Sequence, residues 1–170
     1  MSFKAVAQEA VAQPTTEAKV PDGPVALSET YGDWVVSCQQ ANATSGMPTR
    51  ICQMSQELRQ REGNQLLLLI AITPSDTAAP RATLVAPFGL KLSEGAAVAV
   101  GDKTIANAPF DTCLPAGCIA YLDLNPDAMD SLLTGEVAQV VLMPTQSQER
   151  LLIEISLAGF TTAWARLNLF

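Results

Sequence analysis

The sequence predicts an all-β fold, an antiparallel β-sandwich with one or two short helices. Two observations indicate this fold class. Short segments of alternating or wholly apolar residues recur about every ten residues, with turn-forming residues between them. Of the 170 residues, 48% are hydrophobic and only 16% are charged, so a polar, disordered chain is excluded for most of the length. A closed β-barrel is the second architecture that this pattern fits.

The N-terminal segment differs from the rest of the chain. In residues 1–28 no hydrophobic period persists, and small residues, Gln, Thr and Pro dominate. Such a segment buries too little apolar surface to offset the entropy lost on ordering. We therefore assign residues 1–29 to a flexible tail and residues 30–170 to a single domain. No apolar signal-peptide core follows Lys4, but a linker-like start and four cysteines are typical of an exported protein whose signal peptide has been removed.

Predicted strands begin at Tyr31. In YGDWVVSC, the side chains of Trp34, Val36 and Cys38 share one face, with the period of two expected for a half-buried strand. The segment RICQMSQELRQ and the apolar run 66–72 are separated by the turn REGN, which predicts a hairpin. Because the second of these strands is apolar on both faces, we expect it to be central in its sheet.

The strand pattern continues through the second half of the chain. PRATLVAPFGLKLSEG (80–95) predicts two short strands, broken at Pro87. AAVAVGDKTIA (96–106) predicts a hairpin with Gly101 and Asp102 at its tip. Three further strands are predicted in CIAYLDL (118–124), EVAQVVLMP (136–144) and ERLLIEISL (149–157).

Two helices are predicted among these strands. In the segment 125–135, Asn125 is the expected N-cap, Pro126 the first helical residue and Gly135 a left-handed terminator. In the segment 159–170, large apolar side chains recur at i, i+4 and i+7, which predicts a helix packed on the sandwich by one stripe. This stripe consists of Phe160, Trp164 and Leu167.

Charge and composition exclude several functions. The formal net charge is −7, and the ten basic residues are scattered, so we expect neither a nucleic-acid partner nor a polybasic membrane-binding patch. The longest apolar run, LLLLIAI, is too short to cross a bilayer as a helix. The chain has no histidine, which excludes Ser–His and Cys–His nucleophile pairs and imidazole metal ligands. We therefore predict a non-enzymatic protein.

The alternative is an exported enzyme that uses carboxylates or a thiol pair. The candidate carboxylates lie in or beside polar strand positions, which is typical of a solvated face: Glu57, Glu62, Glu149 and Glu154. The candidate thiols are Cys113 and Cys118. We expect no catalytic, cofactor-binding or metal-binding residue.

The four cysteines form two local pairs in the sequence. Four thiols permit three pairings, but Cys38 ends one predicted strand and Cys52 begins the next. Cys113 and Cys118 lie in one tight loop, PFDTCLPAGC (109–118), so neither local pair needs a distant contact. As disulfides, the longer and shorter loops are expected to stabilise the fold by about 3 and about 2 kcal/mol.

A zinc site and a redox pair are the alternatives for these cysteines. Structural zinc ligands are usually two to four residues apart, and the thirteen residues between Cys38 and Cys52 fit that spacing poorly. A redox pair usually opens a helix, whereas here Pro115 and Gly117 lie in the loop and a strand follows. Structural disulfides are therefore the prediction.

These motifs together resemble the invasion-associated locus B proteins of alphaproteobacteria and their relatives. In order and spacing the resemblance covers residues 31–167. The combination of Gly-Asp-Trp before a cysteine with Pro-Phe-x-x-Cys-x-x-x-Gly-Cys is its most specific part. The segments that carry it are YGDWVVSC, ICQMSQ, APFGLKLSEG, PFDTCLPAGC and GFTTAWARL.

The resemblance implies an exported all-β protein, periplasmic, secreted or associated with the outer membrane. Some members of the family are virulence-associated and take part in the invasion of host red cells, whereas many others belong to free-living bacteria. It places all four cysteines at family positions, and it implies no known reaction, cofactor or catalytic residue. We expect an interaction protein whose partner is another protein or an envelope component. Residues 39–50 and 109–118 are the loops in which we expect recognition.

Overall fold

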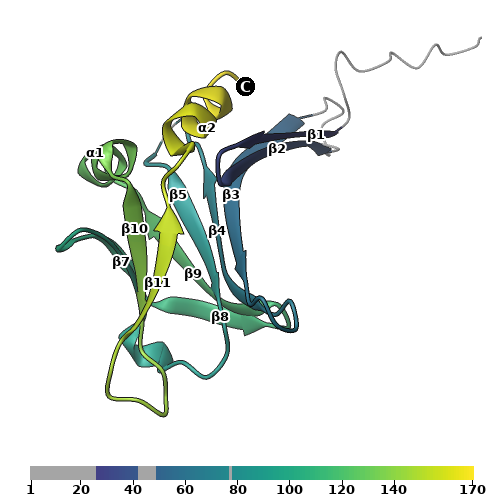
Figure 1. Cartoon of the computed structure of the whole chain (residues 1–170). Helices are drawn as coiled ribbons and strands as arrows, with labels where there is room; N and C mark the ends of the chain where they lie inside the picture. The colour runs from purple at the N-terminus through teal and green to yellow at the C-terminus, as the bar shows by residue number, and fades with distance from the viewer. Residues whose placement is uncertain (1–25, 42–48, 77) are drawn as a thin grey trace, which may run out of the picture.

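The computed structural model of the chain describes residues 26–41, 49–76 and 78–170. These residues form two antiparallel sheets that face each other, with two short helices at one end (Figure 1). The predicted β-sandwich is therefore confirmed. Within the described ranges no ladder of hydrogen bonds closes the sheets into a barrel, so the alternative architecture is wrong.

The larger sheet has seven strands in the order β1-β2-β3-β4-β5-β9-β8. Its strands are β1 (Ala26–Tyr31), β2 (Trp34–Ala41), β3 (Thr49–Arg59), β4 (Leu66–Thr73), β5 (Arg81–Ala86), β8 (Phe110–Leu114) and β9 (Gly117–Asp123). The smaller sheet has four strands in the order β11-β10-β6-β7. Its strands are β6 (Ala96–Val100), β7 (Lys103–Ala108), β10 (Val137–Leu142) and β11 (Leu151–Ser156).

The core lies between the two sheets and is built by alternation along each strand. On β2 the predicted face of Trp34, Val36 and Cys38 is buried. The apolar run at 66–72 becomes β4, which is the central strand of the larger sheet, as predicted. Under the helices, Trp34 and Phe160 are each only 1% exposed, and their rings meet edge to face with centroids 5.0 Å apart.

Both predicted helices are present, with one difference at a helix end. Helix α1 (Pro126–Thr134) begins at the predicted cap, where Asn125 Oδ1 accepts the Ala128 N–H at 2.8 Å. Gly135 ends this helix but is extended (φ −79°), so the expected left-handed exit is wrong. A Cβ at Gly135 would lie 2.9 Å from the Ser131 carbonyl oxygen, so the position requires a small residue for space.

Helix α2 (Phe160–Leu167) covers the end of the sandwich above β1, β2 and β3 (Figure 1). Of its predicted stripe, Phe160 and Leu167 are fully buried, while Trp164 is half-buried. Within the described residues no helix is long and apolar enough to cross a membrane.

Two turns from opposite ends of the chain meet below α2. Gly32, between β1 and β2, and Gly159, which precedes α2, both have positive φ. A Cβ at Gly32 would collide with the Ala158 carbonyl, and one at Gly159 would collide with the Tyr31 carbonyl. Asp33 N donates to Ala158 O at 3.0 Å, so backbone contacts backbone directly.

The structure corrects three further sequence predictions. Strand β1 begins at Ala26, inside the segment assigned to the tail; residues 1–25 lie outside the described residues. The segment 88–95 contains no second strand: Leu90 makes a single bridge, and a 3-10 helix (η1, Leu92–Glu94) follows. The segment 109–118 is a hairpin rather than a loop, because Phe110–Leu114 pairs with β9.

Candidate functional site

The structure contains both local disulfides that the sequence predicts. Cys38 and Cys52 are directly opposite each other on β2 and β3, with Cα atoms 4.0 Å apart, and both are buried. Cys113 and Cys118 are opposite each other on β8 and β9, with Cα atoms 3.9 Å apart. Each disulfide therefore staples neighbouring strands at a fixed register.

The two disulfides lie near opposite edges of the larger sheet, so the four sulfur atoms do not converge on one site. Among the described residues no cluster of His, Cys, Asp and Glu is arranged to hold a metal ion. Of the two expected recognition loops, residues 42–48 lie outside the described residues, and residues 109–118 form the β8–β9 hairpin.

The candidate carboxylates stay apart in the structure. All four are exposed: Glu57, Glu62, Glu149 and Glu154. Glu57 pairs with Arg59 on the same strand, at the surface. Glu62 lies in the β3–β4 turn, and Glu154 lies on β11 in the other sheet. The geometry therefore does not assemble them into a shared acid–base site.

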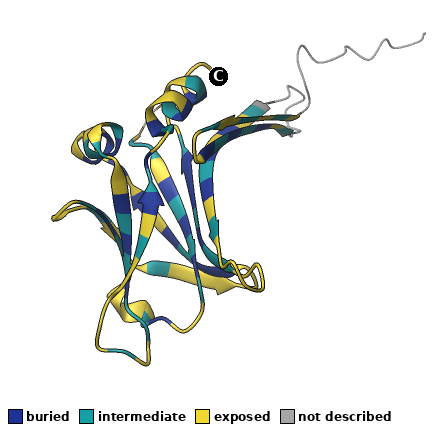
Figure 2. Ribbon diagram, in the orientation of Figure 1, coloured by how far each residue is buried: buried dark blue, intermediate teal, exposed yellow. Residues whose placement is uncertain are grey.

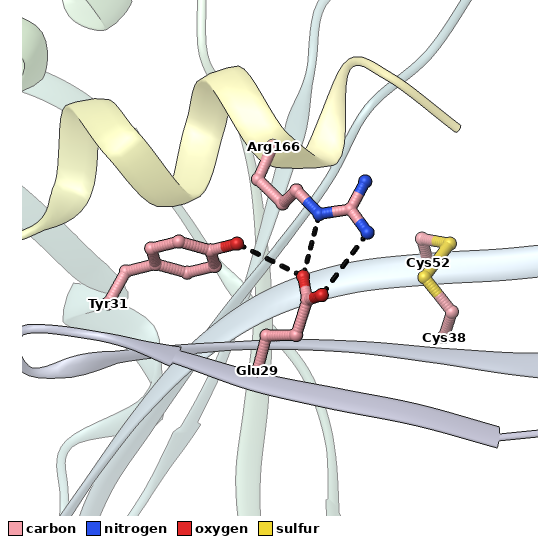
Figure 3. Close-up of a disulfide and its surroundings, with 5 residues drawn as sticks. All are labelled: Glu29, Tyr31, Cys38, Cys52 and Arg166. Carbon is pink, nitrogen blue, oxygen red and sulfur yellow. Dashed lines mark hydrogen bonds and ion pairs between the residues drawn. A yellow bond between two sulfur atoms is a disulfide. The ribbon is translucent and has the colours of Figure 1, made fainter.

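An ion pair joins β1 to α2 beside the Cys38–Cys52 disulfide (Figure 3). The Arg166 guanidinium donates to both carboxylate oxygens of Glu29, at 2.7 and 3.2 Å, and Tyr31 Oη donates to Glu29 Oε2 at 3.1 Å. The hydrogen bonds from Arg166 hold the pKa of Glu29 below its ordinary value of 4.5. Both oxygens of the Glu29 carboxylate accept hydrogen bonds from Arg166 on α2, which indicates that Glu29 has a structural role.

A buried amide joins the two sheets where β3 lies beside the edge of β11, a contact region that we call the seam. Gln56 on β3 is only 5% exposed. Its Nε2 donates to Ser156 O on β11 at 3.0 Å, and its Oε1 accepts from Ser156 N at 3.1 Å. Trp34 Nε1 donates to the same Ser156 oxygen at 2.9 Å. Gln56 thus pairs with the edge of β11 as a neighbouring strand does. Sequence reasoning missed this residue, because a lone glutamine among alternating residues carries no signal.

The opposite end of the sandwich exposes large apolar side chains. Figure 2 shows that this end, below the sheets, is mostly exposed. Its loops contact one another: Lys91 N donates to Met143 O, and Thr145 N donates to Gly89 O, both at 2.8 Å. We call the exposed apolar side chains of these loops and the adjoining strand ends the open-end patch: Phe88, Leu92, Leu114, Leu151 and Leu152.

A groove opens beside the open-end patch, between the lower part of β11 and the larger sheet. Its volume is about 550 Å³, and its lining is mainly apolar, with Leu67, Pro87, Leu151 and Ile153 among its residues. A second hollow of about 380 Å³ lies over β6 and has polar walls that include Arg150. Apolar surface that remains exposed beside a groove is typical of a protein-binding site.

The fold and these surfaces define a disulfide-stapled β-sandwich with one helix-covered end and one open apolar end. The model of the family described as "Invasion associated locus B (IalB) protein" matches residues 34–168. The chain therefore belongs to this family, as the motifs predict.

Named relatives agree with this assignment. An invasion protein B homolog of Brucella abortus (strain 2308) is 32% identical over 151 residues, which cover 89% of this chain and 84% of that protein. Invasion protein B of Bartonella bacilliformis is 30% identical over 158 residues, covering 89% of this chain and 80% of the relative. The crystal structure of invasion associated protein B from Bartonella henselae matches with a TM-score of 0.73 at 24% identity, covering 84% of this chain and 95% of that chain. This last similarity shows a shared fold.

Proposed function

We propose that the protein is an exported, non-enzymatic interaction protein that binds a partner protein of the envelope or of a host cell through its open end. The observation that carries this proposal is the open-end patch. Phe88 is 61% exposed and Leu152 is 52% exposed, although the sandwich has a well-formed core in which to bury such side chains. Leaving several large apolar groups in water on one end is costly, and in soluble proteins such surfaces usually serve binding.

Export is supported by the cysteines. All four are paired in disulfides, and disulfides persist in oxidising compartments such as the periplasm or the cell surface. The relatives in Brucella and Bartonella are named for invasion. For this chain we propose the same broad role, invasion of a host cell or a general task in the envelope, with protein binding as its molecular basis.

The proposal is tested by photo-crosslinking from the open end. A photoreactive phenylalanine analogue replaces Phe88 in the full chain, and a matched variant carries the same analogue at Leu169, which is 76% exposed at the helix-covered end. In envelope extract and in membrane extract of a host cell, we expect a discrete crosslinked partner from position 88 in at least one of the two extracts and none from position 169.

A second measurement separates a specific surface from general stickiness. Replacing Leu151 with serine is expected to reduce the crosslink at position 88 while leaving the melting temperature nearly unchanged, because Leu151 is exposed. Equal crosslinking from both positions, or none from position 88, contradicts the proposal.

A further inference from the structure

Strand β11 has one unpaired edge. It is the outermost strand of the four-stranded sheet, and among the described residues it pairs with β10 alone. In an antiparallel strand, the backbone N–H and C=O of successive residues point alternately to the two sides. Ser156 turns both of these groups away from β10 and toward Gln56. Residues two and four positions earlier, Glu154 and Leu152, therefore turn their backbone groups to the same free side.

The free edge is occupied at one end only. The backbone N–H of Ser156 donates to Gln56, and its backbone oxygen accepts from both Gln56 and Trp34. Among the described residues no group hydrogen-bonds to the outward backbone of Leu152 or Glu154. An edge strand with unpaired N–H and C=O groups is a template for another strand. The side chain of Gln56 already pairs with this edge through a single amide, and two further positions remain open.

The groove runs beside these two open positions. Leu152, Ile153 and Glu154 form one of its walls, and Leu67 and Pro87 lie on the other side. A strand that pairs with β11 places alternate side chains toward this apolar lining, which is how strand addition combines backbone affinity with side-chain selectivity. The groove has a volume of about 550 Å³, so side chains of an added strand have space beside β11.

Charge indicates what kind of segment fits. Glu154 is the charged residue of the groove lining, and the whole chain carries a formal net charge of −7. Arg150 lines the other hollow, over β6. A second copy of this chain brings the same negative charge, so electrostatics disfavours it, whereas a segment with basic side chains is attracted.

We propose that an extended segment of a partner protein, apolar on alternate residues and carrying basic side chains, adds to β11 as a fifth strand of the smaller sheet. Its backbone pairs with Leu152 and Glu154, its apolar side chains enter the groove, and a basic side chain lies beside the Glu154 carboxylate. This inference rests on the proposed function and specifies how the partner is held.

The probe for this proposal is a synthetic nonapeptide of alternating lysine and valine, measured by fluorescence anisotropy against the full chain. Leu152→Pro removes one N–H on the free side and leaves the ladder to β10 intact, because the Leu152 amide points away from β10. We expect this variant to bind about tenfold more weakly. Its matched control, Leu152→Ala, keeps the N–H and is expected to lose only a few-fold.

A test on the wild-type protein does not depend on the folding of any variant. The same peptide, N-methylated at alternate residues so that one edge cannot donate, is expected to lose binding. In hydrogen exchange followed by NMR, the amides of Leu152 and Glu154 are expected to become protected when the unmodified peptide is present. A peptide with glutamate in place of lysine is expected to bind at least about tenfold more weakly, because it faces Glu154.

The outcomes separate the two proposals. Unchanged binding after N-methylation, absence of protection at Leu152 and Glu154, or no binding of the lysine–valine peptide overturns strand addition. None of these results alters the crosslinking readout at Phe88, which tests the proposed function alone. Equal affinity for the glutamate peptide overturns the assignment of a basic partner.

Discussion

The helix-covered end and the open end of the sandwich use their side chains in opposite ways. At the helix-covered end, α2 buries Phe160 against Trp34, and a bidentate ion pair joins Arg166 to Glu29. At the open end, the described residues form loops and the short 3-10 helix η1 but no α-helix, and Phe88 and Leu152 remain exposed. Both ends belong to the same two sheets, so the sheets alone do not determine which end is closed.

The contrast separates stability from recognition along one molecule. Polar groups at the helix-covered end are satisfied inside the protein, as for Gln56 with Ser156, so substitutions there leave buried donors or acceptors unpaired. Under the proposed function, apolar groups at the open end contact a partner, so we expect substitutions there to change binding with little effect on folding. Each of the following experiments tests this division.

The largest expected effect comes from the aromatic contact under α2. Phe160→Ala is expected to lower the free energy of unfolding by about 4 kcal/mol, because it leaves a cavity beside Trp34. Phe88→Ala is the matched control at the open end, where the same truncation is expected to cost less than about 0.5 kcal/mol. Urea denaturation of both variants measures the difference, and similar losses would show that the two ends do not differ as described.

Removing the buried amide is expected to have the next largest effect. Gln56→Leu leaves the Ser156 N–H unpaired in the seam, and we expect a loss of about 2–3 kcal/mol. Gln139→Leu, on the outer face of the smaller sheet, is the control and is expected to change little. A Gln56→Leu variant as stable as wild type would mean that water enters the seam and replaces the amide.

The two disulfides are expected to contribute in proportion to the loops that they close. Replacing Cys38 and Cys52 together with serine is expected to cost about 3 kcal/mol, and replacing Cys113 and Cys118 together about 2 kcal/mol. Thermal unfolding of the two double variants gives the order. Non-reducing peptide mapping checks the pairing independently: recovery of a peptide joining Cys38 to Cys113 is incompatible with the structure.

The smallest expected effect is the pH dependence of the Glu29–Arg166 ion pair. Hydrogen bonds from Arg166 lower the pKa of Glu29 in the folded protein, so the unfolded chain binds the proton more readily. The contribution of the pair is therefore complete above the ordinary pKa of 4.5 and is lost as the pH falls through the lower folded value. Glu29→Gln is expected to flatten this part of the stability curve, whereas Glu62→Gln, in an exposed turn, leaves it unchanged. Urea titrations between neutral and acidic pH measure both.

Much of the fold was predictable because its signals are local. The alternation of Trp34, Val36 and Cys38 and the Asn125 cap each depend on neighbours in the chain, and the structure contains both. Strand β1 was missed because its alternation, ALSETY, is weak until it pairs with β2. Strand β8 was missed because Pro109 and Pro115 predict a loop, whereas the residues between them, Phe110–Leu114, form a strand.

The functional surfaces were not predictable in the same way. The role of Gln56 depends on Ser156, and the groove depends on β4 and β11 meeting across the sandwich. Phe88 and Leu152 are exposed because no other described segment packs over them, which no local pattern encodes. The cysteine pairs were the exception, because each pair joins adjacent strands.

The contact between Gly32 and Gly159 has a consequence for the order of events during biosynthesis. A ribosome makes the β1–β2 turn among the first residues of the domain and the turn before α2 among the last, yet each turn leaves no space for a side chain at the other. The N-terminal hairpin can pair with β3 early, but its turn at Gly32 has no contact with the segment before α2 until the last part of the domain has been made. For the export proposed above, a chain that crosses a membrane unfolded benefits from this late step, since the contact that completes the domain forms only with the residues before α2.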